Sequence, residues 1–185
     1  MDTPMIDLNP LLADLNTRLI SVGRVPFAQD APRPAEAVEM MRVVIFVLGE
    51  TRYAVDIRYV HEVARRSDFT PVPGLPAWIL GVINLHGEIV SVVDLAAFLK
   101  VNLSVASHVP DMLVVAQAGD QRIGFMVNRV DLIYSFPADQ VLSLPLRGEP
   151  QLVPFLRGAI DRDGDLIRLL DGERLLLGPQ MQQFS

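Results

Sequence analysis

The spacing of hydrophobic residues changes along the chain from a helical period to a strand-like one. Near the N-terminus, leucines recur every three or four residues from Leu8 to Leu19, which gives the segment one apolar face. Asn9 followed by Pro10 is typical of a helix start, because the Asn side chain accepts from free amides and proline suits the first helical position. The sequence therefore predicts an amphipathic helix and a linker rich in proline and alanine, together spanning residues 1–40.

From Arg42 onward, short apolar runs of strand length follow one another and are separated by turns. The predicted strands begin at Val43, Tyr53, Gly81, Ile89, Met112, Arg122, Leu156 and Leu166. Only short stretches between them favour a helix, namely Arg58–Ala64, Leu95–Lys100 and Arg174–Leu177. This part of the chain is therefore predicted to be mostly β, with short helices.

An internal repeat groups the predicted strands into two copies. The segment from Trp78 to Asp94 aligns without a gap with the segment from Phe155 to Asp171. The residues that carry the repeat are Gly81, Asn84, Gly87 and Asp94 in the first copy, and Gly158, Gly164 and Asp171 in the second. Each copy is predicted to be a β-hairpin, because Asp-Gly favours a two-residue turn and glycine permits positive φ. The final aspartate is predicted to cap the first turn of a short helix.

Two such copies predict two small five-stranded β-barrels, because closing a sheet removes its free edges. We expect the first barrel within residues 41–105, the second within residues 106–177, and a C-terminal tail over residues 178–185. A barrel of this size buries limited surface, so the two are expected to pack together through an apolar joint. The margins of that joint are expected to form a groove.

Composition narrows the range of partners and locations. The chain of 185 residues has 16 Lys and Arg against 22 Asp and Glu, a net charge of −6, which repels phosphate backbones and anionic lipids. We therefore expect no nucleic-acid partner and no membrane insertion. The chain contains no cysteine, which excludes disulfides and thiolate metal sites. The pattern predicts neither a signal peptide nor a membrane span, so a cytoplasmic location is expected.

The residues that most often carry chemistry are not grouped into a reactive site in the sequence. His61, His86 and His108 have no second ligand at the spacing of a metal site, and the segment Asp161–Asp165 departs from the calcium-loop pattern. No nucleophile elbow, phosphate-binding loop or dinucleotide motif occurs. The sequence therefore predicts no enzyme, no cofactor and no metal site. Phosphorylation of His61 is a separate alternative, which the short segment around it disfavours.

Several motifs together resemble the CheW family of chemotaxis coupling proteins. In the first half they are Leu48-Gly49, Tyr53–Ile57, Val60-x-Glu62-Val63, Pro71-x-Pro73 and above all Gly81–Leu95. The second half adds Met112–Val127 and Leu156–Asp171. The resemblance covers about residues 42–177. It implies a non-enzymatic scaffold of two SH3-like β-barrels that bridges a CheA-type histidine kinase to the cytoplasmic tips of chemoreceptors. The resemblance also implies association with receptor arrays at the inner membrane.

The resemblance further implies two binding regions. A receptor helix is expected in the groove between the barrels, where apolar side chains would bury its stripe and Glu62 would set its orientation. The expected groove residues are Ile57, Val60, Glu62, Val63, His86, Val127 and Val130. Kinase contacts are expected at the barrel ends, at Leu75, Trp78, Leu144 and Arg147.

The sequence departs from the usual family pattern at three positions. His86 and Ala96 stand where the family usually has arginine, and Ser91 stands where it usually has proline. An imidazole and a guanidinium present different donors and charges to a partner. The departures suggest a variant coupling protein of an accessory chemosensory system. The alternative is a β-barrel module that binds a different signalling partner or restrains the kinase.

Overall fold

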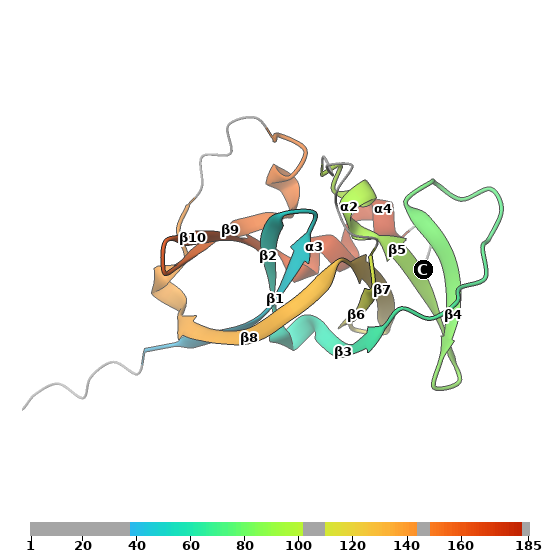
Figure 1. Ribbon diagram of the computed structural model, residues 1–185, viewed down its shortest axis with the longest axis horizontal. Helices are drawn as coiled ribbons and strands as arrows, with labels where there is room; N and C mark the ends of the chain where they lie inside the picture. The colour runs from blue at the N-terminus through green and yellow to red at the C-terminus, as the bar shows by residue number, and fades with distance from the viewer. Residues whose placement is uncertain (1–37, 102–109, 144–148, 183–185) are drawn as a thin grey trace, which may run out of the picture. The chain divides into compact units, whose positions relative to one another are not determined.

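The computed structural model describes residues 38–101, 110–143 and 149–182, and these are mostly β (Figure 1). The strands are β1 Met40–Leu48, β2 Thr51–Asp56, β3 Val60–Arg65, β4 Ile79–Leu85, β5 Glu88–Asp94, β6 Met112–Ala118, β7 Gln121–Val127, β8 Arg129–Pro137, β9 Leu156–Arg162 and β10 Asp165–Leu170. The helices are η1 Ile57–Tyr59, α2 Leu95–Phe98, η2 Ala138–Gln140, η3 Val153–Phe155, α3 Gly172–Leu177 and α4 Pro179–Gln182. No described helix has the length and apolar character needed to cross a membrane. The predicted N-terminal helix lies outside the described residues.

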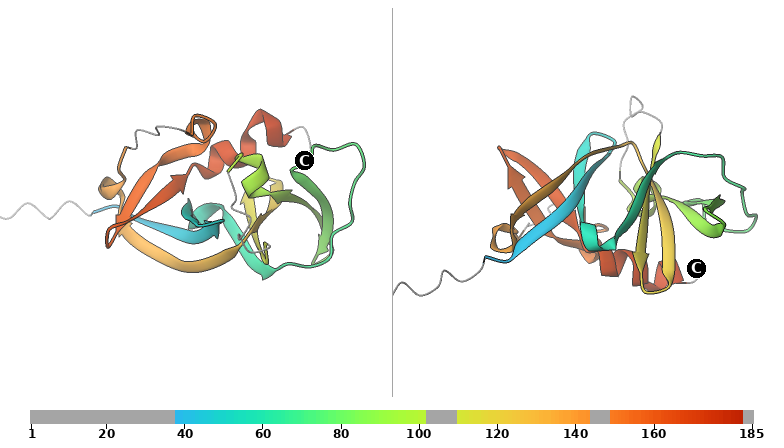
Figure 2. Two further views of the ribbon diagram at one scale, coloured as in Figure 1. Left: turned by 45° about the horizontal axis from the view of Figure 1, so that its top comes forward. Right: turned by 90° about the horizontal axis from the view of Figure 1, so that it is seen from below.

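The strands form two five-stranded sheets that exchange hairpins with each other (Figure 2). Sheet A has the order β8-β1-β2-β10-β9, and sheet B has the order β3-β6-β7-β5-β4. The first hairpin of each copy therefore joins the last three strands of the other copy. The parallel pairs β2 with β10 and β5 with β7 make these connections together with the antiparallel pairs β1 with β8 and β3 with β6. The prediction that residues 41–105 and 106–177 each form one barrel is wrong, because the turn η1 carries the chain from sheet A into sheet B.

Each sheet is closed by one isolated backbone bridge, which joins the segment after one edge strand to the other edge strand. In sheet B, Thr70 and Val82 exchange two backbone hydrogen bonds of 2.8 and 3.0 Å, and in sheet A an equivalent pair closes at Ala159. The repeated glycine lies at this bridge in each copy. A Cβ on Gly81 would overlap the carbonyl oxygen of Thr70, and one on Gly158 would lie 2.6 Å from the facing carbonyl oxygen. The absence of a side chain at these two positions therefore permits closure of both sheets.

The two predicted hairpins and their helix caps are confirmed. The turn residues all have positive φ: His86 53° and Gly87 92° in one hairpin, Asp163 55° and Gly164 85° in the other. Each turn is tightened by a side chain, because Asn84 and Asp161 accept hydrogen bonds of 2.8 and 2.9 Å from the glycine amides. Asp94 and Asp171 cap α2 and α3 by accepting from amides 3.0 and 3.1 Å away. Local sequence therefore determines these turns and caps.

A shared hydrophobic core joins the two sheets, as the predicted apolar joint requires. Sheet A encloses a cluster around Ile45 and Ile167, and sheet B encloses one around Val92 and Val115. A larger central cluster takes residues from both sheets and from the helices that follow them. Met181 of α4 lies in this central cluster with 2% of its surface exposed. The first residues of the predicted tail therefore form a packed helix.

Two strands depart from the sequence prediction. The stretch Arg58–Ala64, for which the sequence favours a helix, contains one turn of 3-10 helix and then β3. The hydrophobic pattern also did not predict β8. Both strands lie at a sheet edge and contain a β-bulge. Since a bulge inserts one extra residue and breaks the alternation of buried and exposed positions, the strand period is hidden in both.

Candidate functional site

The bulge in β3 turns two valines toward the same side of sheet B. Val60 is paired with Ala116, and Val63 is paired with Val114. Two residues separate the valines on β3, whereas one residue separates their partners on β6. The extra residue is His61, which has no partner in the register. Strand residues three apart normally point to opposite faces. Because of the bulge, Val60 and Val63 instead point to the face that adjoins the central cluster.

An equivalent bulge in β8 has the same effect in sheet A. Val130 is paired with Phe46 and Ile133 with Val44, and Asp131 is the extra residue. Val130 and Ile133 therefore point to one face of sheet A, as the two valines of β3 do in sheet B. We call the four side chains the joint face; its members are Val60, Val63, Val130 and Ile133.

The joint face is apolar and open to solvent at its outer members. Val60 and Val130 are half-buried against the central cluster, which places both next to the contact between the sheets. Val63 and Ile133 are 40% and 54% exposed. The strands β3 and β8 both run along the lower side of the molecule in Figure 1. Exposed apolar side chains gathered on one face are typical of a protein-binding surface.

The predicted groove residues divide into separate sets in the structure. Val60, Val63 and Val130 belong to the joint face, and Ile57 is half-buried in η1 just before β3. Val127 has 0% of its surface exposed and belongs to the central cluster. Its inclusion among surface contacts is wrong, because β7 lies between β5 and β6 and its end is covered by β1.

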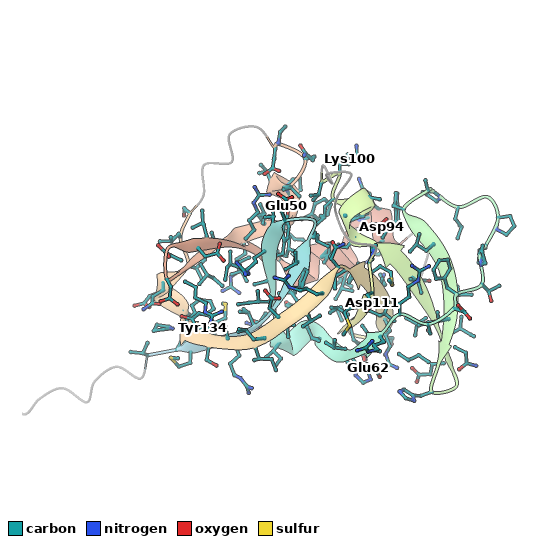
Figure 3. All side chains as sticks on the ribbon, in the orientation of Figure 1. Glu50, Glu62, Asp94, Lys100, Asp111 and Tyr134 are labelled. Atoms are coloured by element: carbon teal, nitrogen blue, oxygen red, sulfur yellow. The ribbon has the colours of Figure 1, made fainter. Side chains whose placement is uncertain are left out.

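Glu62 and His86 meet each other on the opposite face of β3. Glu62 is paired with Val115, a core residue of sheet B, so its side chain points away from the joint face. Its Oε2 lies 3.3 Å from Nε2 of His86 in the β4–β5 turn, and Figure 3 shows Glu62 on β3. The contact is an ion pair only when the imidazole is protonated. These two predicted residues therefore link β3 to the hairpin next to it.

The bulge residue of β8 is the centre of a charged network. Asp131 accepts from Nε of Arg129 at 2.6 Å and from Nε of Arg52 at 3.0 Å. Arg52 also donates to Asp165 at 2.5 Å, which connects β8, β2 and β10. The hydrogen bond from Arg129, followed by that from Arg52, holds the pKa of Asp131 below its ordinary value despite partial burial. This network links the bulge of β8 to β2 and β10.

Half of the predicted kinase-facing residues lie in the described part of the chain. Leu75 and Trp78 are half-buried, and the Trp78 ring meets the edge of the Phe98 ring at 5.0 Å. Phe98 in turn contacts Phe155, the counterpart of Trp78 in the second copy, at 5.1 Å. Phe98 and Phe155 also line an open cleft of about 950 Å³ between α2, η3, α3 and α4. Residues 144 and 147 lie outside the described residues, so the kinase contacts of Leu144 and Arg147 stay predictions.

Sequence reasoning missed Ile133, although the repeat contains the signal that identifies it. The turns after β1 and β6 align at Gly49 and Gly119, which have similar positive φ of 63° and 58°. Extending this alignment along the chain places Val63 of β3 on Ile133 of β8. The two residues also pair with equivalent partners in the adjacent strands. An exposed valine in one copy thus indicates an exposed isoleucine in the other.

The two barrels exchange hairpins and carry an accessible apolar face, a surface of the kind that binds other proteins. Residues 42–179 match the family model described as the CheW-like domain, and the chain belongs to this family. It is 32% identical over 142 residues to the chemotaxis protein CheW of Thermotoga maritima, covering 77% of this chain and 91% of that protein. It is 30% identical over 152 residues to the protein FrzA of Myxococcus xanthus, covering 80% and 93% of the two chains.

A solved structure has the same fold. The scaffolding protein TtCheW from Thermoanaerobacter tengcongensis matches with a TM-score of 0.63 and 24% identity, covering 72% of this chain and 90% of that one. The chain is therefore a CheW-like scaffold protein of chemotaxis-type signalling systems. Members of this family act as adaptors rather than as enzymes.

Proposed function

We propose that the chain couples chemoreceptors to a CheA-type histidine kinase, and that the joint face receives a receptor helix. The observation that carries this proposal is the pair of equivalent bulges, which present apolar side chains from both sheets next to their contact. Membership of the CheW-like domain family supports the class of partner. The coupled complex would hold the chain at receptor arrays on the cytoplasmic side of the inner membrane.

The physical basis of receptor binding is the burial of an apolar helix stripe. A helix presents apolar residues at intervals of three and four, which matches a narrow apolar surface with accessible outer members. Val63 and Ile133 have the most exposed apolar area on the joint face, so they gain most from being covered. The kinase would bind elsewhere, at the barrel end that includes Leu75 and Trp78.

The test is reconstitution with the two proposed partners. The purified chain is mixed with a CheA-type kinase and a receptor cytoplasmic fragment from the same organism, and co-elution and kinase activity are measured. We expect a ternary complex with altered kinase activity; a rise indicates activation and a fall indicates restraint. Absence of binding to both proteins contradicts the proposal.

A matched pair of variants locates the receptor site. Val63→Asp should weaken receptor binding by about 2 kcal/mol or more, because the complex would bury an unpaired carboxylate. Val72→Asp is the control, since Val72 has the same 40% exposure but lies in the loop between β3 and β4. Equal loss in both variants, or no loss in either, would place the receptor site away from the joint face.

A further inference from the structure

We infer that the joint face selects a partner helix with an acidic residue beyond each end of its apolar stripe. The inference deepens the proposed function and rests on it for the location of the site. It comes from two arginines, Arg42 of β1 and Arg65 of β3, which lie at the two outer ends of the joint face. Neither arginine is among the residues that the sequence motifs indicate.

The strand register places both arginines on the same side as the apolar residues. Arg42 is two residues from Val44, the partner of Ile133, and alternation along β1 turns both side chains to one face. Arg65 is two residues from Val63 on β3, beyond the bulge. Residues two apart on a strand are about 6.6 Å apart, a little more than one helical turn. An acidic residue about one turn beyond the apolar stripe would therefore meet each arginine.

The repeat makes the two ends equivalent. Arg42 is paired with Ser135, and Arg65 is paired with Met112. In the alignment of the two copies, Met112 corresponds to Arg42 and Ser135 corresponds to Arg65. The same rung of each sheet therefore contains one arginine, contributed by β1 in sheet A and by β3 in sheet B. The joint face thus has one positive charge at each end.

These two charges are available to a partner. Both side chains are exposed, and neither forms an ion pair with another described residue. By contrast, neighbouring arginines are engaged: Arg58 binds Asp56 at 2.5 Å, and Arg129 binds Asp131. The chain as a whole has a net charge of −6, whereas these two exposed arginines put positive charge beside the apolar face. Such complementarity favours acidic partners and discriminates against basic ones.

Two designed peptides of about 18 residues test the inference, a length that permits a stable amphipathic helix when the peptide is side-chain stapled. Both have the same leucine stripe; one has glutamate beyond each end of the stripe and the other has lysine. Binding is measured by fluorescence anisotropy at low and high salt. We expect the unmodified chain to prefer the glutamate peptide by about tenfold or more at low salt, because two exposed charge pairs each change affinity several-fold. High salt should reduce that preference.

Charge reversal gives the decisive comparison. In the double variant with Arg42→Glu and Arg65→Glu, the preference should pass to the lysine peptide. Lys100→Glu is the control, because Lys100 is exposed and Figure 3 shows it beyond α2, on the side away from β3. Thermal melting of each variant checks that the fold is retained.

The inference is overturned if the unmodified chain binds the two peptides equally or binds neither. It is also overturned if Lys100→Glu changes the preference as much as the double variant does. These peptides contain no receptor or kinase sequence, so their result is separate from the reconstitution. A chain that binds receptor and kinase but does not distinguish the peptides retains the proposed function and loses the inference.

Discussion

Sheet A and sheet B share their strand pairing but differ in the side chains that cross their parallel pairs. In sheet A, the hydroxyl of the fully buried Tyr53 accepts from Arg168 at 3.0 Å, and Arg168 also pairs with Glu149 at 2.6 Å. In sheet B, the two corresponding strand positions hold Ile123 and Ser91. Burial raises the pKa of Tyr53, so the phenol is neutral at physiological pH.

The comparison separates what the fold requires from what each sheet can vary. Both sheets need a glycine at the closing bridge, two turn residues with positive φ and an aspartate cap. Both also place an ion pair across the parallel strands, Arg52 with Asp165 in sheet A and Arg122 with Glu88 in sheet B. The tyrosine–arginine contact and the charged bulge of β8 belong to sheet A alone. Backbone geometry is therefore shared between the copies, whereas side-chain chemistry has diverged.

The closing glycines should give the largest effect on stability. Gly81→Ala is expected to destabilise the protein by about 3 kcal/mol, because the new Cβ overlaps a backbone oxygen and φ is already +145°. Gly158→Ala should cost about 2 kcal/mol, since its Cβ would lie 2.6 Å from the facing oxygen without a positive φ. Urea unfolding measures both.

Gly164→Ala is the control for these two variants. It has positive φ but open space around the new Cβ, so about 1 kcal/mol is expected. If Gly81→Ala and Gly158→Ala cost no more than Gly164→Ala, the steric role of the closing bridge is refuted.

The tyrosine–arginine contact of sheet A should give a smaller effect. Tyr53→Phe removes the acceptor of a partly buried guanidinium and is expected to cost about 1.5 kcal/mol. Tyr134→Phe is the matched control, because Tyr134 is half-buried and stacks on Phe136, but no hydrogen bond of its hydroxyl occurs within the described residues. Differential scanning calorimetry compares the two, and equal losses would refute a specific role for the Arg168 contact.

The bulge of β8 should make stability depend on acid through Asp131. The pKa of Asp131 is lowered in the folded state, so its stabilisation is present above the unfolded pKa of about 3.9 and is lost as pH falls through the folded pKa. Asp131→Asn should therefore reduce the unfolding free energy by about 1 kcal/mol at pH 6. The difference from the unmodified chain should shrink toward pH 3.

Urea unfolding across this pH range provides the measurement. A difference between Asp131→Asn and the unmodified chain that stays constant down to pH 3 would contradict the assigned cause.

The sequence predicted the features that depend on neighbouring residues and missed those that depend on distant ones. The turns at Gly87 and Gly164 and the caps at Asp94 and Asp171 follow from local chemistry, and all four are confirmed. The exchange of hairpins between sheets arises from the pairing of strands far apart in the chain, which the local hydrophobic pattern does not reveal. The prediction that Val127 is a surface contact failed for the same reason. The hydrophobic pattern of a strand does not reveal whether a second sheet covers an apolar residue.

The candidate site shows why the bulges matter for prediction. Alternation along β3 groups Val60 with Glu62, whereas the structure groups Val60 with Val63 and sends Glu62 to His86. One extra residue per strand is enough to change which side chains face a partner. Only comparison of the two copies identifies Ile133, since no family motif marks it in the sequence.

The exchange of hairpins has a consequence for how the protein is made. Sheet A cannot be completed on the ribosome until β10 at Leu170 has been synthesised, because the N-terminal strands β1 and β2 wait for partners from the C-terminal end. Sheet B has all of its strands once β7 ends at Val127. A gene cut between the two copies would produce two fragments that each lack strands for both barrels. Such fragments would have to assemble with each other to recover the fold, as two halves of a heterodimer.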